Sequence, residues 1–224
     1  METVVMIPGL GNDAAVWQST IDALGIDADC WIGDTLSDDS LSAMAARILA
    51  AAPPRFALAG VSMGGMVALE IMRMAPERVS RLMICDSNAS PDTLEAVTQR
   101  RATNAAMFGA TDLAALAAPV IGYMVHDAAA HVRQALLAMT LRVGAAAYVR
   151  QNEAVIARHD LRPVLATIAV PTIVAVGAND LMTAVACARE ISDAIPAATL
   201  HIIPACGHLP PIEQPHVVAD LIRQ

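Results

Sequence analysis

The sequence predicts an α/β fold in which a mostly parallel sheet is buried between helices. Short apolar runs of strand length alternate with longer helical stretches, both before residue 90 and after residue 160. The chain is also very apolar, with 56% hydrophobic residues and a mean hydropathy of +0.51. Its uninterrupted apolar runs stay below the roughly 18 residues that a membrane-spanning helix needs. The composition therefore indicates parallel strands buried on both faces.

The net charge, the N-terminal residues and the spacing of the cysteines argue against several classes of protein. A formal net charge of −8 and a pI of about 5.1 argue against nucleic acid or an anionic membrane as partner. The N-terminus lacks a basic segment and enters a strand at once, which predicts a cytoplasmic protein without a secretory signal. The four cysteines lie far apart, without the spacing of a metal site, and are predicted to be buried free thiols.

The first half of the chain reads as four strands separated by three helices. A β-branched run forms the first strand and ends at Pro8, Pro53 and Pro54 stop the second helix, and Pro76 stops the third. The predicted strands are 3–7, 28–32, 56–61 and 81–85, and the predicted helices are 14–24, 41–51 and 66–74.

The alternation breaks at residue 91 and resumes near residue 160. Between them lie helical stretches rich in Ala, Met and Leu, with predicted breaks near Gly109, 119–122, Asp127 and Gly144. We interpret 91–159 as a cap of three or four helices inserted into a core formed by 1–90 and 160–224. The later elements are the strands 171–177 and 199–203 and the helices 183–195 and 212–223, which gives six parallel strands.

Ser62 lies between a buried strand and a buried helix, in the sequence Gly60-Val61-Ser62-Met63-Gly64. This sequence fits the pattern G-x-S-x-G, which holds a serine on a sharp strand-to-helix turn with its hydroxyl exposed at the carboxyl edge of a sheet. Glycines flank the serine because side chains there would collide where strand and helix approach. Ser62 is therefore the predicted nucleophile.

The turn Pro8-Gly9-Leu10-Gly11 follows the first strand and is predicted to lie beside Ser62. Small residues in such a turn let a substrate oxygen approach the backbone. The amides of Leu10 and Met63 are the predicted oxyanion hole.

Two further strand-end loops carry a carboxylate and an imidazole. Asp180 ends the run Gly177-Ala-Asn-Asp180, and His208 lies in the loop after the last strand. Parallel strands bring their carboxyl ends to one edge, so His208 could accept the Ser62 proton while Asp180 orients the ring. Asp86, which follows the fourth strand, is the alternative acid, although it could equally cap the start of the helical cap.

These segments resemble the nucleophile, acid and histidine segments of the α/β-hydrolase superfamily, over nearly the whole chain. The matching sequences are Gly-Val-Ser-Met-Gly-Gly, Gly-Ala-Asn-Asp and Cys-Gly-His-Leu-Pro-Pro-Ile-Glu-Gln-Pro. Within the superfamily, the chain is most similar to small bacterial carboxylesterases and 3-oxoadipate enol-lactonases. The resemblance implies the α/β-hydrolase fold, and the order Ser, Asp, His is that of the superfamily.

The chain also departs from the pattern of the superfamily. Pro8-Gly9-Leu10-Gly11 stands where relatives commonly have His-Gly-x-Gly, so only the backbone donor carries over. The turn comes so early that the usual first two strands are predicted to be absent. The strand 28–32 would then form an edge with which a second copy of the chain could pair as a homodimer.

The predicted function is hydrolysis of a carboxylic ester or lactone of a small hydrophobic substrate, through an acyl-enzyme and without metal or cofactor. The same triad would also serve a C–C bond hydrolase, an acyltransferase or a perhydrolase. A non-catalytic binding protein on this fold would typically have lost Ser62, His208 or the acid. Apolar residues of the predicted cap indicate a hydrophobic ligand, although most of them are expected to form the core of the cap: Leu113, Leu116, Met124, Leu136, Leu137, Met139 and Tyr148.

Overall fold

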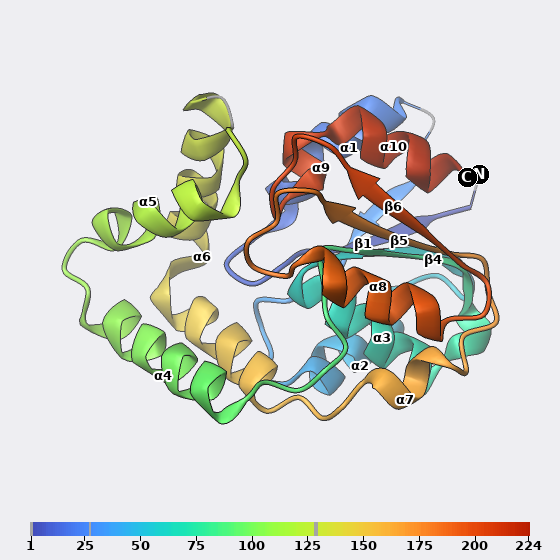
Figure 1. Cartoon of the computed structure of the whole chain (residues 1–224), viewed down its shortest axis with the longest axis horizontal. Coiled ribbons are helices and arrows are strands. Elements are labelled where there is room, and N and C mark those ends of the chain that lie inside the picture. Colours follow the sequence, from blue (N-terminus) through green and yellow to red (C-terminus); the bar gives the residue numbers. More distant parts are fainter. Residues whose placement is uncertain (1, 27, 128–129) are drawn as a thin grey trace.

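The protein is built around a six-stranded parallel sheet (Figure 1). This computed structural model describes residues 2–26, 28–127 and 130–224, so residues 128 and 129 of the predicted cap lie outside it. The strand order is β2-β1-β3-β4-β5-β6, and every neighbouring pair is parallel. The strands are β1 (Val4–Ile7), β2 (Cys30–Ile32), β3 (Phe56–Val61), β4 (Val79–Cys85), β5 (Thr172–Gly177) and β6 (Ala198–Ile203). The predicted α/β fold is confirmed.

Helices cover both faces of the sheet. Figure 1 shows α1 and α10 on one face and α2, α3 and α8 on the other. Apart from three helices described below, the described helices are η1 (Ala14–Trp17), α1 (Gln18–Leu24), α2 (Leu41–Ala51), α3 (Met63–Met74), η2 (Pro76–Arg78), α7 (Arg162–Leu165), α8 (Val185–Ala194), α9 (Pro210–Glu213) and α10 (Pro215–Arg223).

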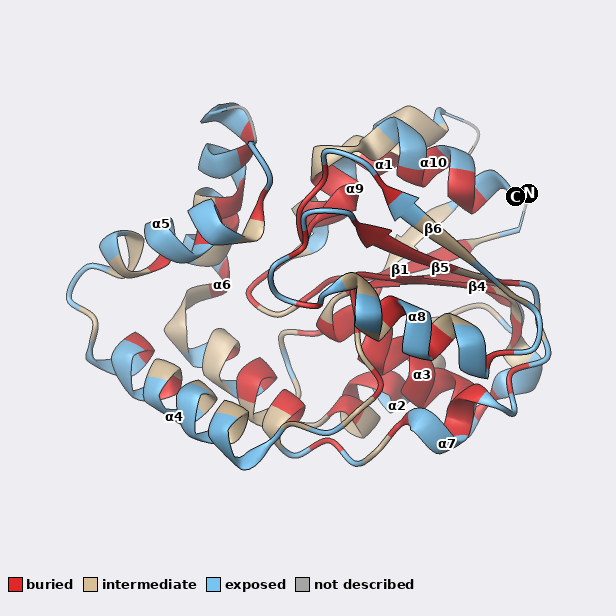
Figure 2. Cartoon of the chain, in the orientation of Figure 1, coloured by how far each residue is buried: buried red, intermediate tan, exposed pale blue. Residues whose placement is uncertain are grey.

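The strands bury side chains on both faces, as the apolar composition predicts. Val5 and Ile7 of β1 pack into the core beneath α2 and α3, whereas the alternating Val4 and Met6 pack into the core beneath α1 and α10. Figure 2 shows that buried residues concentrate in the sheet and in α3. The buried centre of the molecule therefore carries the turn that contains Ser62.

Three of the described helices between β4 and β5 lie beyond the carboxyl ends of the strands (Figure 1). They are α4 (Leu94–Gly109), α5 (Leu113–Met124) and α6 (Ala130–Ile156), and we call them the α4–α6 segment. The predicted break at Gly144 is present inside α6, where Gly144 has φ 70° and ψ 165°. These left-handed angles suit glycine and divide α6 into two halves.

The predicted break at 119–122 is wrong, because α5 continues through Pro119. Proline cannot donate a hydrogen bond to the carbonyl four residues earlier, which belongs to Ala115. Both residues lie on the exposed face of α5, where water can hydrate that carbonyl. Ala117 and Ile121 keep the opposite face of the helix buried.

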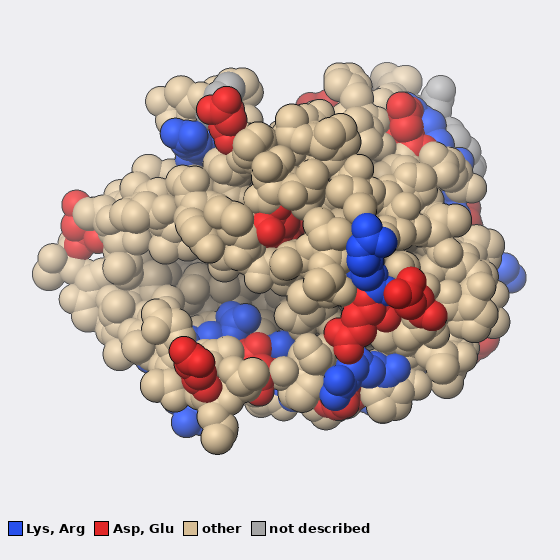
Figure 3. Space-filling model, in the orientation of Figure 1, with Lys and Arg blue, Asp and Glu red and all other residues tan. Residues whose placement is uncertain are grey.

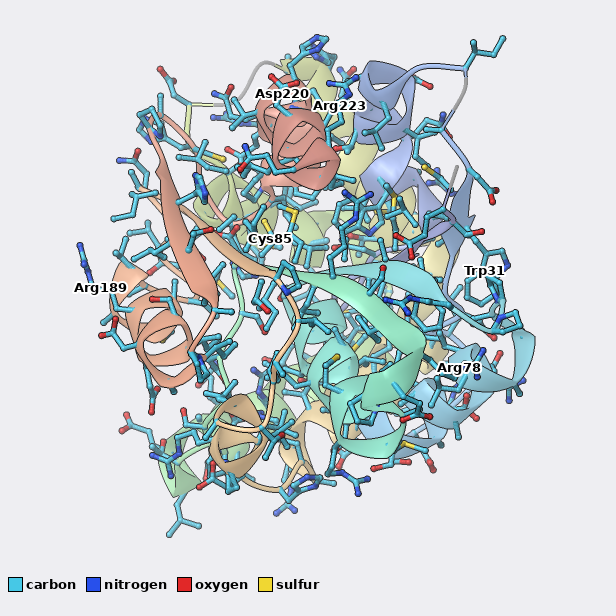
Figure 4. All side chains as sticks on the ribbon, turned by 90° about the vertical axis from the view of Figure 1, so that its right-hand side faces the viewer. Trp31, Arg78, Cys85, Arg189, Asp220 and Arg223 are labelled. Atoms are coloured by element: carbon cyan, nitrogen blue, oxygen red, sulfur yellow. The ribbon has the colours of Figure 1, made fainter. Side chains whose placement is uncertain are left out.

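Three smaller predictions about the chain can be checked. The strand 28–32 is shortened to Cys30–Ile32, but it does form an edge of the sheet. All four cysteines are free, and Cys85 and Cys206 are buried while Cys30 and Cys187 are half-buried. Figure 4 shows Cys85 in the interior, whereas Arg189 extends outward. Among the described residues, none of the helices is both long and apolar enough to cross a membrane.

Candidate active site

Ser62 sits on a strained turn between β3 and α3. Its φ of 56° and ψ of −121° are left-handed, and its backbone is fixed by a bond from its N–H to the Cys85 carbonyl at 2.8 Å. A Cβ at Gly60 would collide with the backbone of Gly64, and one at Gly64 with the backbone of Ile7. The two glycines of the motif are therefore required by the close approach of strand and helix.

His208 bridges Ser62 and Asp180. The distance from His208 Nε2 to Ser62 Oγ is 2.9 Å, and the distance from His208 Nδ1 to Asp180 Oδ2 is also 2.9 Å. The His208 amide donates to the Met124 carbonyl at 2.7 Å, which ties the histidine loop to the end of α5. The structure thus brings the three predicted side chains, from three separate strand ends, into one hydrogen-bonded chain.

Asp180 is surrounded by donors that favour its ionised form. Its carboxylate accepts hydrogen bonds from the Met182 amide at 2.7 Å, the Thr183 amide at 3.1 Å and the Thr183 hydroxyl at 2.6 Å. Burial by itself would raise the pKa of Asp180, but the bond and charge of His208, together with these donors, outweigh it and hold the pKa at about 2. Asp180 is therefore placed to orient the imidazole ring.

Asp86, the alternative acid, lies directly behind Asp180. It accepts the Gly177 amide at 2.9 Å and the Cys85 thiol at 3.2 Å, so it does not cap a helix. Burial, and then the neighbouring charge of Asp180, raise the pKa of Asp86 well above its ordinary value. Among the described contacts, the bond to His208 is made by Asp180 and not by Asp86.

Asp86, Asp180 and His208 offer three ligand atoms within 4.8 Å of one another, a grouping that could in principle hold a metal ion. Their chemistry gives another reason for the proximity. Asp180 Oδ2 and His208 Nδ1 are bonded to each other, and the raised pKa of Asp86 favours a neutral carboxyl group. Each of the three groups thus already has hydrogen-bond partners within the protein: Asp180 and His208 bond each other, and Asp86 accepts the Gly177 amide and the Cys85 thiol.

The predicted oxyanion turn does lie against Ser62. A Cβ built on Gly9 would come within 3.1 Å of Ser62 Cβ. Met63 is the first residue of α3, so its amide has no acceptor within the helix. The turn is held by Gln151, whose side-chain oxygen accepts the Gly11 amide at 2.8 Å. Gln151 was not predicted from the sequence, because a glutamine inside a helix carries no motif.

A cavity of about 420 Å³ lies in front of Ser62 and His208, between the sheet edge and the α4–α6 segment. Figure 3 shows the hollow on the face that it draws. Four of the seven apolar residues singled out in the predicted cap line it, namely Leu116, Met124, Leu136 and Tyr148, although most of the seven were expected to form the core of the cap; Met139 is fully buried in the core. Asn88 and Arg100 also line the cavity and were not singled out in the sequence.

Comparison with known proteins agrees with this architecture. A pimeloyl-[acyl-carrier protein] methyl ester esterase from Pectobacterium carotovorum is 28% identical, over 98% of this chain and 92% of that protein. 3-Oxoadipate enol-lactonase 2 from Acinetobacter baylyi is 30% identical, over 76% of this chain and 65% of that protein. The names of both relatives describe hydrolases that act on ester bonds.

The fold is shared with solved structures as well. A thermophilic esterase from Thermogutta terrifontis superposes with a TM-score of 0.89 at 23% identity, covering 100% of this chain and 88% of that one. The sequence model of the alpha/beta hydrolase family matches residues 4–221. The chain therefore belongs to the alpha/beta hydrolase family.

Proposed function

We propose that the protein is a serine hydrolase that cleaves a carboxylic ester or lactone of a small hydrophobic substrate through an acyl-enzyme on Ser62. The observation that carries the proposal is the pair of 2.9 Å hydrogen bonds that join Ser62, His208 and Asp180 at the floor of the cavity. A serine hydroxyl is a weak nucleophile until a base accepts its proton, and His208 Nε2 is within reach to do so.

In the proposed reaction, Ser62 Oγ attacks the ester carbonyl while its proton passes to His208. The ionised Asp180 stabilises the resulting imidazolium, and the amides of Leu10 and Met63 donate to the oxyanion. His208 then returns the proton to the leaving alcohol. In the second half, His208 takes a proton from water, the water attacks the acyl group, and Ser62 is released with the acid.

Two observations support an ester as the substrate. The cavity is lined mainly by apolar side chains and opens directly on Ser62, which suits an acyl chain. The relatives that match most of this chain include methyl ester esterases, and the enol-lactonase cleaves a cyclic ester.

Labelling with a fluorophosphonate tests the nucleophile. The folded protein should gain one covalent adduct on Ser62, detectable by mass spectrometry of the peptide, and should lose ester hydrolysis at the same rate. The Ser62→Ala variant should neither label nor cleave esters. Absence of an adduct on the folded wild-type protein would remove the proposed function, and turnover of cyclic enol-lactones alone would narrow it to a lactonase.

A further inference from the structure

The cavity in front of Ser62 has two chemically different sides. Residues of α5 and of the first half of α6 give an apolar side, whereas the loop after β4, the first half of α4 and the second half of α6 give a polar side. The apolar side includes Leu116, Val120, Ile121 and Leu136, and the polar side includes Asn88, Gln99, Arg100 and Tyr148.

Arg100 is the one Lys, Arg, Asp or Glu residue that lines the cavity in the part of the chain that the structure describes. The whole chain carries a formal net charge of −8. A single guanidinium therefore stands inside the cavity of an acidic protein. In a site shielded from water, such a charge acts more strongly than it would on an open surface.

The Arg100 side chain is held firmly, so it is prepared for a ligand. Its Nε donates to Asp92 Oδ2 at 2.6 Å, and its Nη1 donates to Asn152 Oδ1 at 2.9 Å. The side chain is nevertheless 30% exposed. A guanidinium has five N–H donors, so donors remain for a carboxylate, which matches their planar arrangement.

The ion pair with Asp92 does not cancel the positive charge. Arg158 also binds Asp92, at 2.7 Å, and its own side chain is only 1% exposed. Burial would raise the pKa of Asp92, but the two arginines outweigh it, so the carboxyl group is ionised. Two guanidinium groups thus share one carboxylate, which leaves one positive charge. Glu153, on the neighbouring turn of α6, is bonded to Asn104 and is not among the described lining residues.

Tyr148 lines the same cavity as Arg100 and lies beside the oxyanion turn. The edge of its ring packs against Gly11 of the oxyanion turn, where a Cβ would come within 3.3 Å of Tyr148 Cδ2. Burial raises the pKa of the Tyr148 hydroxyl, and the charge of Arg100 opposes that rise. A substrate whose carbonyl is held at the turn would therefore lie in the same cavity as Arg100.

We infer that the ester cleaved at Ser62 carries a carboxylate a few methylene groups from the scissile carbonyl, and that Arg100 binds this carboxylate while the apolar side holds the rest of the substrate. The inference rests on the proposed function and names a substrate class for it. Arg100 is then a specificity residue rather than a catalytic one, since it contacts the substrate away from the reacting atoms.

Matched pairs of methyl esters test the inference on the wild-type protein. Monomethyl esters of the linear diacids from succinate to suberate are compared with methyl esters of the monocarboxylic acids of equal length. At the best length, kcat/KM should be at least about tenfold higher for the ester with the carboxylate, because a charge-assisted hydrogen bond is among the strong ones. The preference should weaken as salt is added.

Arg100→Met should bring the ratio of kcat/KM within each pair close to one, and Arg100→Lys should restore part of it. The ratio cancels any general loss of active protein. Arg101→Met is the matched control, because Arg101 is the next residue of α4, is exposed and is not among the described lining residues. It removes the same charge and should leave the ratio at the wild-type value.

The outcomes separate this inference from the proposed function. If no ester of either kind is cleaved and Ser62 is not labelled, the proposed function fails. If Ser62 is labelled and both members of every pair are cleaved equally well, or Arg101→Met lowers the ratio as much as Arg100→Met, the role of Arg100 is overturned while the hydrolase function stands.

Discussion

The loops after β4 and β5 each place a buried aspartate at the same edge of the sheet, yet the pKa values of the two carboxyl groups shift in opposite directions. Asp180 receives donors from Met182, Thr183 and His208, and its pKa is lowered to about 2. Burial, and then the neighbouring charge of Asp180, raise the pKa of Asp86. The ends of two strands place two candidate acids at one edge of the sheet. The burial, the hydrogen-bond donors and the charges around each carboxyl group determine the direction in which its pKa shifts.

Asp180 and Asp86 therefore have different roles. One negative charge is concentrated on Asp180, next to the imidazole that becomes positive during the reaction. The neutral form of Asp86 can donate a hydrogen bond to Asp180 while its other oxygen accepts the Gly177 amide. Substitutions at Asp180, Asp86 and Thr183 test these roles, from the largest expected effect to the smallest.

Asp180→Asn should lower kcat/KM by roughly 10⁴-fold, because an amide neither stabilises the imidazolium nor fixes the required tautomer of His208. Steady-state hydrolysis of a short-chain methyl ester measures the effect, and circular dichroism confirms that the fold is kept. A loss below about tenfold, accompanied by a severe loss in Asp86→Asn, would exchange the roles assigned to the two acids.

Asp86→Ala should destabilise the protein by about 1–3 kcal/mol, since it leaves the buried Gly177 amide without its acceptor. Urea unfolding at pH 7 measures the difference. Asp39→Ala is the control, because Asp39 is exposed, and it should change the free energy of unfolding by less than about 0.5 kcal/mol. Equal stability of the two variants would show that Asp86 does not hold the loop after β5.

Thr183→Val should lower kcat/KM by about fivefold. The change keeps the shape of the side chain but removes the hydroxyl that donates to Asp180 Oδ2 at 2.6 Å. A hydrogen bond to a charged group contributes about 1.5–3 kcal/mol to stability. Only part of this free energy acts in the transition state, so the expected loss of activity is smaller. Thr183→Ser retains the hydroxyl and should keep most of the activity. If Thr183→Ser is impaired as strongly as Thr183→Val, packing of the methyl group and not the bond to Asp180 explains the effect.

The sequence predicted the framework of the site better than its surroundings. Ser62, Asp180 and His208 follow strand ends, and parallel strands bring such ends to one edge whatever the loops contain, so their proximity could be foreseen. The state of Asp86 could not, because it depends on which amide and which carboxylate face it after folding. Arg100 and Gln151 lie on helices, where the sequence pattern indicates only which side faces inward. Asn152, which bonds Arg100, and Gly11, which bonds Gln151, lie far away in sequence. The continuation of α5 through Pro119 likewise depends on solvent around one carbonyl.

Asp86→Asn replaces the carboxyl group by an uncharged amide of the same shape. This substitution has the smallest expected effect on activity and tests most directly whether Asp86 is charged in the folded protein. In Asp86→Asn, the amide oxygen can still accept the Gly177 N–H, and the amide nitrogen can still donate to Asp180, so kcat/KM should stay within about threefold of wild type. Stability should respond to pH. Below pH 3.8, Asp86 is neutral in both the folded and the unfolded chain; above it, only the unfolded chain ionises, so the wild type loses stability as pH rises toward the raised pKa of the folded protein.

Asp86→Asn removes that loss, whereas the opposite dependence of Asp180 remains in both proteins. The contribution of Asp180 is present above pH 3.8 and is lost as pH falls toward about 2. The variant should therefore match the wild type in melting temperature near pH 3.5 and exceed it increasingly as the pH rises above 3.8 toward the raised pKa of Asp86 in the folded protein, as measured by calorimetry. A variant that is instead less stable at pH 7 than at pH 3.5, relative to wild type, would mean that Asp86 is ionised in the folded protein. The two loops would then share the negative charge that we assign to Asp180 alone.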